Sequence, residues 1–109
     1  RARLEEFLLA YPNRKTIVMT HHAPSYESIA AEYRNHVDGW VNHAYYSDLT
    51  SLILDNPQIK LWCHGHVHCM NDYMMGNCRV VSNPRGYAGY ENQAERFEKA
   101  SSKVWIELE

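Results

Sequence analysis

The positions of apolar residues along the chain predict an alternation of helices and strands. Near the start, apolar side chains recur every three to four residues, which predicts an amphipathic helix that ends before Pro12. The apolar stripe of this helix is Leu4, Phe7, Leu8 and Tyr11. Two short apolar runs, Thr16–Thr20 and Ile59–Cys63, are typical of buried strands. Between these runs, a second helix is expected from Ser47, as its N-cap, to Asn56.

The second half of the chain has the pattern of a β-hairpin. The segments Asn71–Met75 and Cys78–Ser82 flank Gly76-Asn77, a two-residue turn sequence. Apolar residues alternate with other types from Val104 to Leu108, which predicts a final strand. A strand–helix–strand order followed by a hairpin predicts a mixed α/β sheet, and the 109 residues suit one domain.

Composition limits the kinds of protein to which the chain can belong. Apolar residues make up 45% of it, so disorder is not expected, and the net charge of −2 gives no footprint for nonspecific nucleic-acid binding. No apolar run approaches the roughly 20 residues that a membrane-spanning helix needs, and no secretory signal is visible. The three cysteines cannot all pair, which favours reduced thiols and a cytoplasmic location.

Histidine is unusually frequent, and two groups of histidines directly follow the predicted strands. Of the seven histidines, five stand at positions 21, 22, 64, 66 and 68. In an extended segment, His66 and His68 would point to the same side, with Cα atoms about 6.5–7 Å apart. This spread fits two metals about 3.5–4 Å apart, each binding one imidazole. Gly65 is expected to let the backbone turn sharply, and neighbouring strands would bring His21 to the same place.

Several residues beside these groups have two interpretations. His64, His66 and His68 are two residues apart, so in an extended segment they would point to the same side. His64 therefore either supports a metal ligand from behind or packs within its strand. One histidine of the His21-His22 pair is expected to cap its loop. Cys63 and Cys69 could suggest structural zinc, but their spacing is unusual for zinc, and a role in the core is preferred.

The long irregular segment between Ser25 and Tyr46 is of a length that is often functional. Four of its residues could form a substrate lip, although an ordinary surface loop is the preferred interpretation. These residues are His36, His43, Tyr45 and Tyr46. Asp72 could bond a ligand imidazole and Arg85 a phosphate, but a surface position is preferred for both. The tryptophans are expected to be packing residues, and they are Trp40, Trp62 and Trp105.

The two strand-plus-histidine segments resemble the calcineurin-like metallophosphoesterase superfamily. The matching segments are Ile17–Pro24 and Leu61–His68, followed by Asn71–Tyr73 and by Arg79–Tyr87, a tail typical of one bacterial and phage branch. The most specific feature is Gly-His-x-His combined with the histidine of the upstream strand end. The resemblance covers residues 15–92 and implies that residues 1–109 are the C-terminal half of a four-layer α/β/β/α sandwich with a mixed sheet.

The resemblance also implies roles for single residues. His21 and His66 would bind one of two divalent ions, and His68 would bind the other. His22 would either face the substrate as a catalytic residue or support the metal ligands from behind. The ions would be manganese, iron or zinc, which imidazole and carboxylate ligands suit. The implied activity is the hydrolysis of phosphoric mono- or diesters, in which hydroxide from the dinuclear site attacks phosphorus.

Part of the family pattern does not occur in this chain. The family also uses Asp-x-His, Gly-Asp-x-x-Asp and Gly-Asn-His segments, and none of the three is present. A missing N-terminal half or a partner chain is therefore expected to supply the other ligands, and the absence of an initiator Met agrees with a longer reading frame. The alternative is a noncatalytic metal-binding or interaction fragment of the same fold. A small zinc-stabilised module is a third, weaker option.

Overall fold

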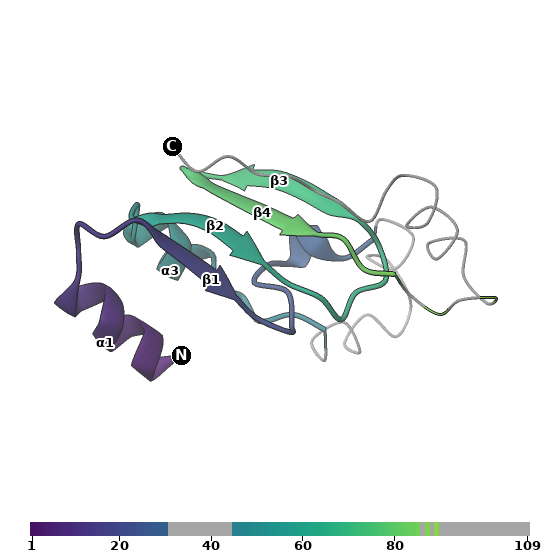
Figure 1. The fold of residues 1–109 in the computed structure, drawn as a ribbon, viewed down its shortest axis with the longest axis horizontal. Helices are drawn as coiled ribbons and strands as arrows, with labels where there is room; N and C mark the ends of the chain where they lie inside the picture. Colours follow the sequence, from purple (N-terminus) through teal and green to yellow (C-terminus); the bar gives the residue numbers. More distant parts are fainter. Residues whose placement is uncertain (31–44, 86, 88, 90–109) are drawn as a thin grey trace.

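Four strands form one mixed sheet in the part of the chain that the structure describes. A computed structural model describes residues 1–30, 45–85, 87 and 89. The strands are β1 (Thr16–Met19), β2 (Ile59–Cys63), β3 (Asn71–Met75) and β4 (Cys78–Ser82). They lie in the order β1-β2-β4-β3, and β1, β2 and β4 are parallel while β3 is antiparallel to β4 (Figure 1). The predicted mixed α/β sheet and its hairpin are confirmed.

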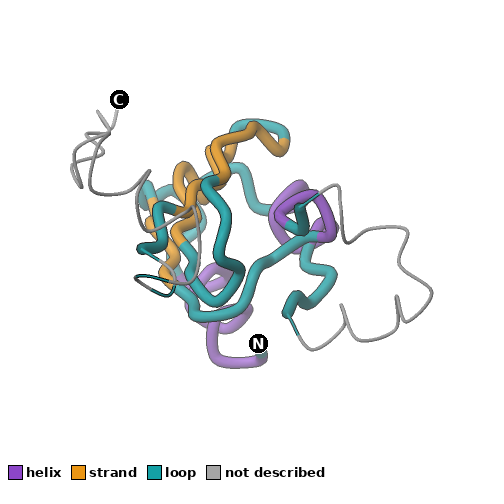
Figure 2. The backbone as a smooth tube through the Cα atoms, turned by 90° about the vertical axis from the view of Figure 1, so that its right-hand side faces the viewer, coloured by secondary structure: helices purple, strands orange, loops and turns teal. Residues whose placement is uncertain are grey.

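The helices cover one face of this sheet. They are α1 (Ala2–Ala10), α3 (Thr50–Asp55) and the short 3-10 turn η1 (Tyr26–Ser28). Val18, Trp62 and Val80 are partners in adjacent strands, so their side chains share one face, which we call the inner face. Leu8 of α1 and Ile53 of α3 join them in the buried core, and Figure 2 shows the helices on one side of the strands. The predicted packing role of Trp62 is confirmed, because none of its surface is exposed.

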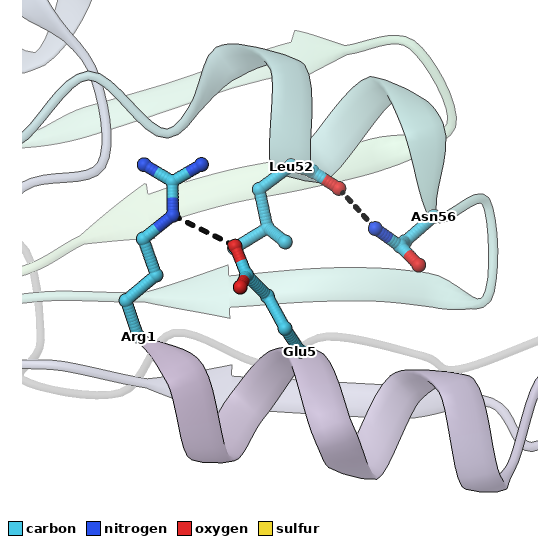
Figure 3. Close-up of polar contacts among 4 residues, drawn as sticks. All are labelled: Arg1, Glu5, Leu52 and Asn56. Carbon is cyan, nitrogen blue, oxygen red and sulfur yellow. Dashed lines mark hydrogen bonds and ion pairs between the residues drawn. The ribbon is translucent and has the colours of Figure 1, made fainter.

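The ends of both helices are held by local polar bonds (Figure 3). Arg1 Nε donates to Glu5 Oε1 at 2.8 Å along the first turn of α1, and Asn56 Nδ2 donates to the Leu52 carbonyl at 2.7 Å where α3 ends. The prediction of Ser47 as N-cap is wrong. The helix begins at Thr50, whose N–H donates to the Asp48 carboxylate at 3.2 Å, so an acidic side chain satisfies an N-terminal donor there.

The prediction of a fully buried first strand is wrong for the outer face of the sheet, which is the face opposite the inner one. β1 stands at one edge of the described sheet, and its residues alternate between buried and exposed. Ile17 is 46% exposed and Met19 is 79% exposed, whereas Val18 is 9% exposed. An apolar run therefore does not by itself tell whether one face or both faces of a strand are covered.

The turn between β3 and β4 confirms the hairpin prediction. Gly76 has φ of 58°, a conformation that costs other residues free energy but is open to glycine. The predicted strand at 104–108 lies outside the described residues, as do Trp105, Trp40, His36 and His43. Among the described residues, no helix has the length and apolar character needed to cross a bilayer.

Candidate metal site

The two histidine groups are brought together by the parallel pairing of β1 with β2. The backbone ladder continues past the strand ends, because Thr20 N–H donates to the Cys63 carbonyl at 2.9 Å and Gly65 N–H donates to the His21 carbonyl at 3.0 Å. The loops after β1 and β2 therefore lie side by side at the carboxyl edge of the sheet, the edge that faces the viewer in Figure 2. This edge is where ligand sites form in open α/β sheets.

The imidazoles of His21 and His66 meet directly. His66 Nδ1 lies 3.1 Å from His21 Nε2, and the ring centroids are 4.8 Å apart. Metal–nitrogen bonds of about 2.0–2.1 Å put two ligand nitrogens on one ion about 2.8–3.4 Å apart, for octahedral to tetrahedral angles. The separation of these two nitrogens thus suits two ligands of one ion. Without an ion, one ring donates a hydrogen bond to the other, so at least one of them is neutral.

His22 lies in the same cluster. Its ring centroid is 4.6 Å from that of His66 and 5.2 Å from that of His21. The loop that carries it is held from the core, because Trp62 Nε1 donates to Thr20 Oγ1 at 2.9 Å and Thr20 Oγ1 donates to the His22 carbonyl at 2.7 Å. A fully buried tryptophan therefore fixes the backbone at the base of the cluster.

The predicted geometry of His66 and His68 is wrong in one respect. The segment after β2 is a series of bends, and His66 has φ of 64°, so the two histidines do not alternate as in a strand. Gly65, which was expected to provide the sharp turn, has no positive φ; the left-handed residue is His66. The His68 ring lies against Tyr87 instead, with centroids 4.6 Å apart. His68 therefore faces a different neighbour from His21 and His66.

Electrostatic effects keep His66 in the form that binds metals. Partial burial lowers the pKa of His66, and the nearby charges of His22, His21 and His68 lower the pKa further. Neutral imidazole is the ligand form, so a lowered pKa favours coordination over protonation near neutral pH. His68, although it contacts Tyr87, is thus close enough to His66 for their charges to interact.

The ligand set within the described residues is incomplete. Among them, no three His, Cys, Asp or Glu side chains are arranged to hold one metal ion, although three imidazole rings are mutually close. His21 Nε2 and His66 Nδ1 lie within hydrogen-bond distance of each other, and the ring of His22 lies against that of His66. His21 and His22 are exposed and His66 is partly exposed, so the cluster lies at the surface of this part of the chain.

Tyr45 forms a side of the cluster that the sequence did not predict. Its ring centroid is 4.8 Å from that of His66, with the two planes inclined at 31°. The Tyr45 carbonyl accepts a hydrogen bond from Ala23 N–H at 3.0 Å, and Ala23 forms a bridge with Tyr46. The end of the irregular segment is therefore tied to the His21-His22 loop. The preferred reading of Tyr45 as an ordinary loop residue misses this contact, and no spacing rule in the sequence signals it.

His64 lies in a buried hydrogen-bond network next to the cluster. Its Nδ1 is 3.0 Å from the Gly65 carbonyl oxygen and its Nε2 is 2.9 Å from Ser28 Oγ, which is 2.7 Å from the Tyr73 hydroxyl. Burial lowers the pKa of His64, and burial raises the pKa of Tyr73, so the imidazole stays neutral and the phenol stays protonated. His64 is buried, as its packed interpretation expects, but it lies just after β2 and in a polar network. Nothing in the sequence pattern pointed to Ser28 or Tyr73.

The remaining candidates lie away from the histidine cluster. Asp72 pairs with Arg79 on the hairpin, with Oδ2 and Nη2 2.6 Å apart, so its predicted surface position is confirmed. Hydrogen bonding to Arg79 lowers the pKa of the Asp72 carboxyl. The predicted core role of Cys63 and Cys69 is wrong, because both are only partly buried; Cys78 is the cysteine within the core.

Comparisons with known proteins add no relative to this picture. No family model, no curated protein and no solved structure matches the chain. The paired strands and the histidine side chains at their carboxyl ends are therefore the features from which a function can be inferred.

Proposed function

We propose that this chain is part of a dinuclear metallophosphoesterase of the calcineurin-like superfamily, which hydrolyses phosphoric mono- or diesters. The observation that carries the proposal is the 3.1 Å separation between His66 Nδ1 and His21 Nε2. These nitrogens come from residues 45 positions apart, and the strand pairing brings them together at the edge where such sites form. The separation is that of two ligands on one ion.

The outer face of the sheet supports the proposed four-layer sandwich. Each of the parallel strands places apolar side chains on this face, and they are exposed at Ile17 and Met19 of β1, whereas Leu61 of β2 and Val81 of β4 are buried. The helices pack on the inner face, so the described part supplies one helix layer and one sheet layer. A second sheet on the outer face would cover this apolar surface and complete an α/β/β/α arrangement.

Each histidine has a distinct part in the proposed site. His21 and His66 would hold one divalent ion, manganese, iron or zinc, and His68 would reach the other. Two bound ions supply the polarisation of phosphoryl oxygens and the hydroxide for attack on phosphorus. His22, whose ring lies against that of His66, would hydrogen-bond the phosphate oxygens of the ester. The further ligands would come from an N-terminal segment or a partner chain.

The proposal is tested by zinc binding to this chain and by hydrolysis in the longer protein. His21→Ala and His66→Ala should each weaken Zn²⁺ binding in calorimetry by about 100-fold or more, beyond what changes around the ligands usually cause. Asp55→Asn is the matched control. It removes an exposed carboxylate of α3, away from the histidine cluster, and should leave the affinity for Zn²⁺ unchanged. In the longer protein, His66→Ala combined with His68→Ala should abolish metal-dependent hydrolysis of a chromogenic phosphodiester.

The same experiments separate the proposal from its alternative. Zinc binding that depends on His21 and His66, without hydrolysis in the longer protein, would favour a noncatalytic metal-binding fragment. That alternative is supported by the described residues, because two imidazole nitrogens lie close together there and no group of three ligands is found. Equal binding by the chain and by both single variants would refute the shared site altogether.

A further inference from the structure

The backbone conformation of His66 needs support from its surroundings. His66 is a non-glycine residue in the left-handed region, and such a strained conformation persists only where neighbouring contacts fix it. Both backbone polar groups of the adjacent Gly65 are hydrogen-bonded. Its N–H donates to the His21 carbonyl at 3.0 Å, and its carbonyl accepts from Val67 N–H at 2.8 Å.

His64 provides a side-chain bond to the same peptide. A carbonyl oxygen can only accept, so the 3.0 Å contact means that His64 Nδ1 carries the proton and donates to Gly65. In the neutral ring Nε2 is then an acceptor, so Ser28 Oγ–H donates to it at 2.9 Å. The serine oxygen is left to accept from Tyr73 O–H at 2.7 Å. Each donor direction in this chain is thus fixed by the one before it.

The network is anchored in rigid parts of the fold. Ser28 is completely buried and Tyr73 belongs to β3, so two distant segments hold the ring of His64 in place. Within the described residues, every buried side-chain nitrogen and oxygen has a partner, so the polar chain is fully satisfied. A satisfied, buried network of this kind rigidifies what it touches, and here it touches the peptide that precedes His66.

We propose that His64, oriented by Ser28 and Tyr73, is a positioning residue that fixes the Gly65 peptide so that the His66 imidazole meets His21. This inference rests on the proposed function, since it names a residue that shapes the same site without binding the metal. His64 acts through the backbone, because its two nitrogens are occupied by Gly65 and Ser28. It is therefore no ligand and no catalytic residue.

A pair of substitutions tests the proposed bond. In His64→Asn the amide nitrogen falls close to the position of imidazole Nδ1 and can still donate to Gly65. In His64→Gln it falls close to the position of Nε2 and can reach Ser28 alone. Thr16→Val is the control, because it removes a buried hydroxyl bond, to the Arg14 carbonyl at 2.9 Å, from the opposite end of β1.

Two readouts separate positioning from general stability. The first is amide hydrogen exchange at Gly65 and Val67 in the metal-free chain, and the second is the dissociation constant for Zn²⁺ alone. His64→Gln should speed exchange about tenfold and weaken Zn²⁺ binding about tenfold, whereas His64→Asn should stay within about threefold of the wild type in both. Thr16→Val should change neither.

The outcomes are decisive in either direction. Equal effects of His64→Asn and His64→Gln, or none in either, would overturn the inference. If His64→Gln does not fold, Tyr73→Phe decides, since about threefold faster exchange at both amides supports the inference and unchanged exchange overturns it. If the wild type binds no Zn²⁺, the proposed function fails, while the exchange measurements still decide the role of His64.

Discussion

The inner and outer faces of the sheet are built from alternate residues of the same strands, yet they differ in what covers them. On β1, Val18 is buried beneath the helices, while its neighbours Ile17 and Met19 are exposed on the outer face. The side chains of both faces are apolar, so hydrophobicity alone does not distinguish the two. Among the described residues, the helices pack on the inner face. Among the parallel strands, the exposed side chains of the outer face are confined to the edge strand β1, because Leu61 of β2 and Val81 of β4, on the same face, are only 6% and 8% exposed.

Cysteine reactivity gives the largest measurable contrast between the faces. Burial in the core raises the pKa of Cys78 to about 11, and nearby Cys63 adds to this effect. At pH 8 the native chain should therefore alkylate Cys78 about 100-fold more slowly than an ordinary thiol, because the thiolate is the reactive form. Cys63, partly buried on the outer face, should react faster than Cys78 when both are followed by mass spectrometry after iodoacetamide. The urea-unfolded chain, as control, should show equal rates, and equally slow rates in the native chain would mean that both faces are covered.

Truncation of adjacent residues on β1 should give the next largest contrast. Val18→Ala removes two methyl groups from the core and should cost about 1.5 kcal/mol in the free energy of unfolding by urea. Ile17→Ala removes more hydrocarbon from an exposed position and should cost less than about 0.8 kcal/mol. If Ile17→Ala lowers the free energy of unfolding as much as Val18→Ala does, the side chain of Ile17 is covered and the two faces do not differ. If the cost of Ile17→Ala is larger in a protein that contains the proposed second sheet, that sheet covers Ile17.

Two glycines should give a further contrast, between the turn of the β3–β4 hairpin and the loop that carries His66. Gly76 has positive φ and lies where a Cβ would come within 2.9 Å of Leu54 Cδ2, so Gly76→Ala should destabilise the chain by about 1–2 kcal/mol. At Gly65 a Cβ would meet His21 Nδ1 at an ordinary 3.7 Å. Gly65→Ala should therefore cost less than about 0.5 kcal/mol in urea unfolding. If Gly65→Ala lowers the free energy of unfolding more than Gly76→Ala does, the turn in the loop depends on the backbone freedom of Gly65 and not on the left-handed conformation of His66.

Much of the sheet could be predicted from local patterns. The apolar runs and the Gly76-Asn77 turn identify β2, β3 and β4, because short-range rules fix strand length and hairpin register. The start of α3 was misjudged, because its N-cap is Leu49, a residue type that cap preferences do not favour, while the Asp48 carboxylate accepts from the Thr50 N–H. Coverage of the outer face could not be predicted, because it depends on what packs there.

The candidate site was predictable in its members but not in its geometry. The proximity of His21 and His66 follows from two strand ends in parallel pairing, which the sequence suggested. The left-handed conformation of His66 and its contact with Tyr45 depend on long-range hydrogen bonds that no periodicity encodes. For the same reason the network of Ser28 and Tyr73 around His64 was missed.

The position of β4 between β2 and β3 has a consequence for the length of the histidine loop. Residues 64–70 leave the end of β2 and must step across the end of β4 before β3 can begin, a span of two strand spacings or about 9–10 Å. Seven extended residues reach about 23 Å, so this bridge is longer than the span requires, and its bends at residues 66–69 take up the excess. A deletion in the bridge should therefore straighten these bends, and so displace His66 and His68, before it shifts the register of β3 with β4.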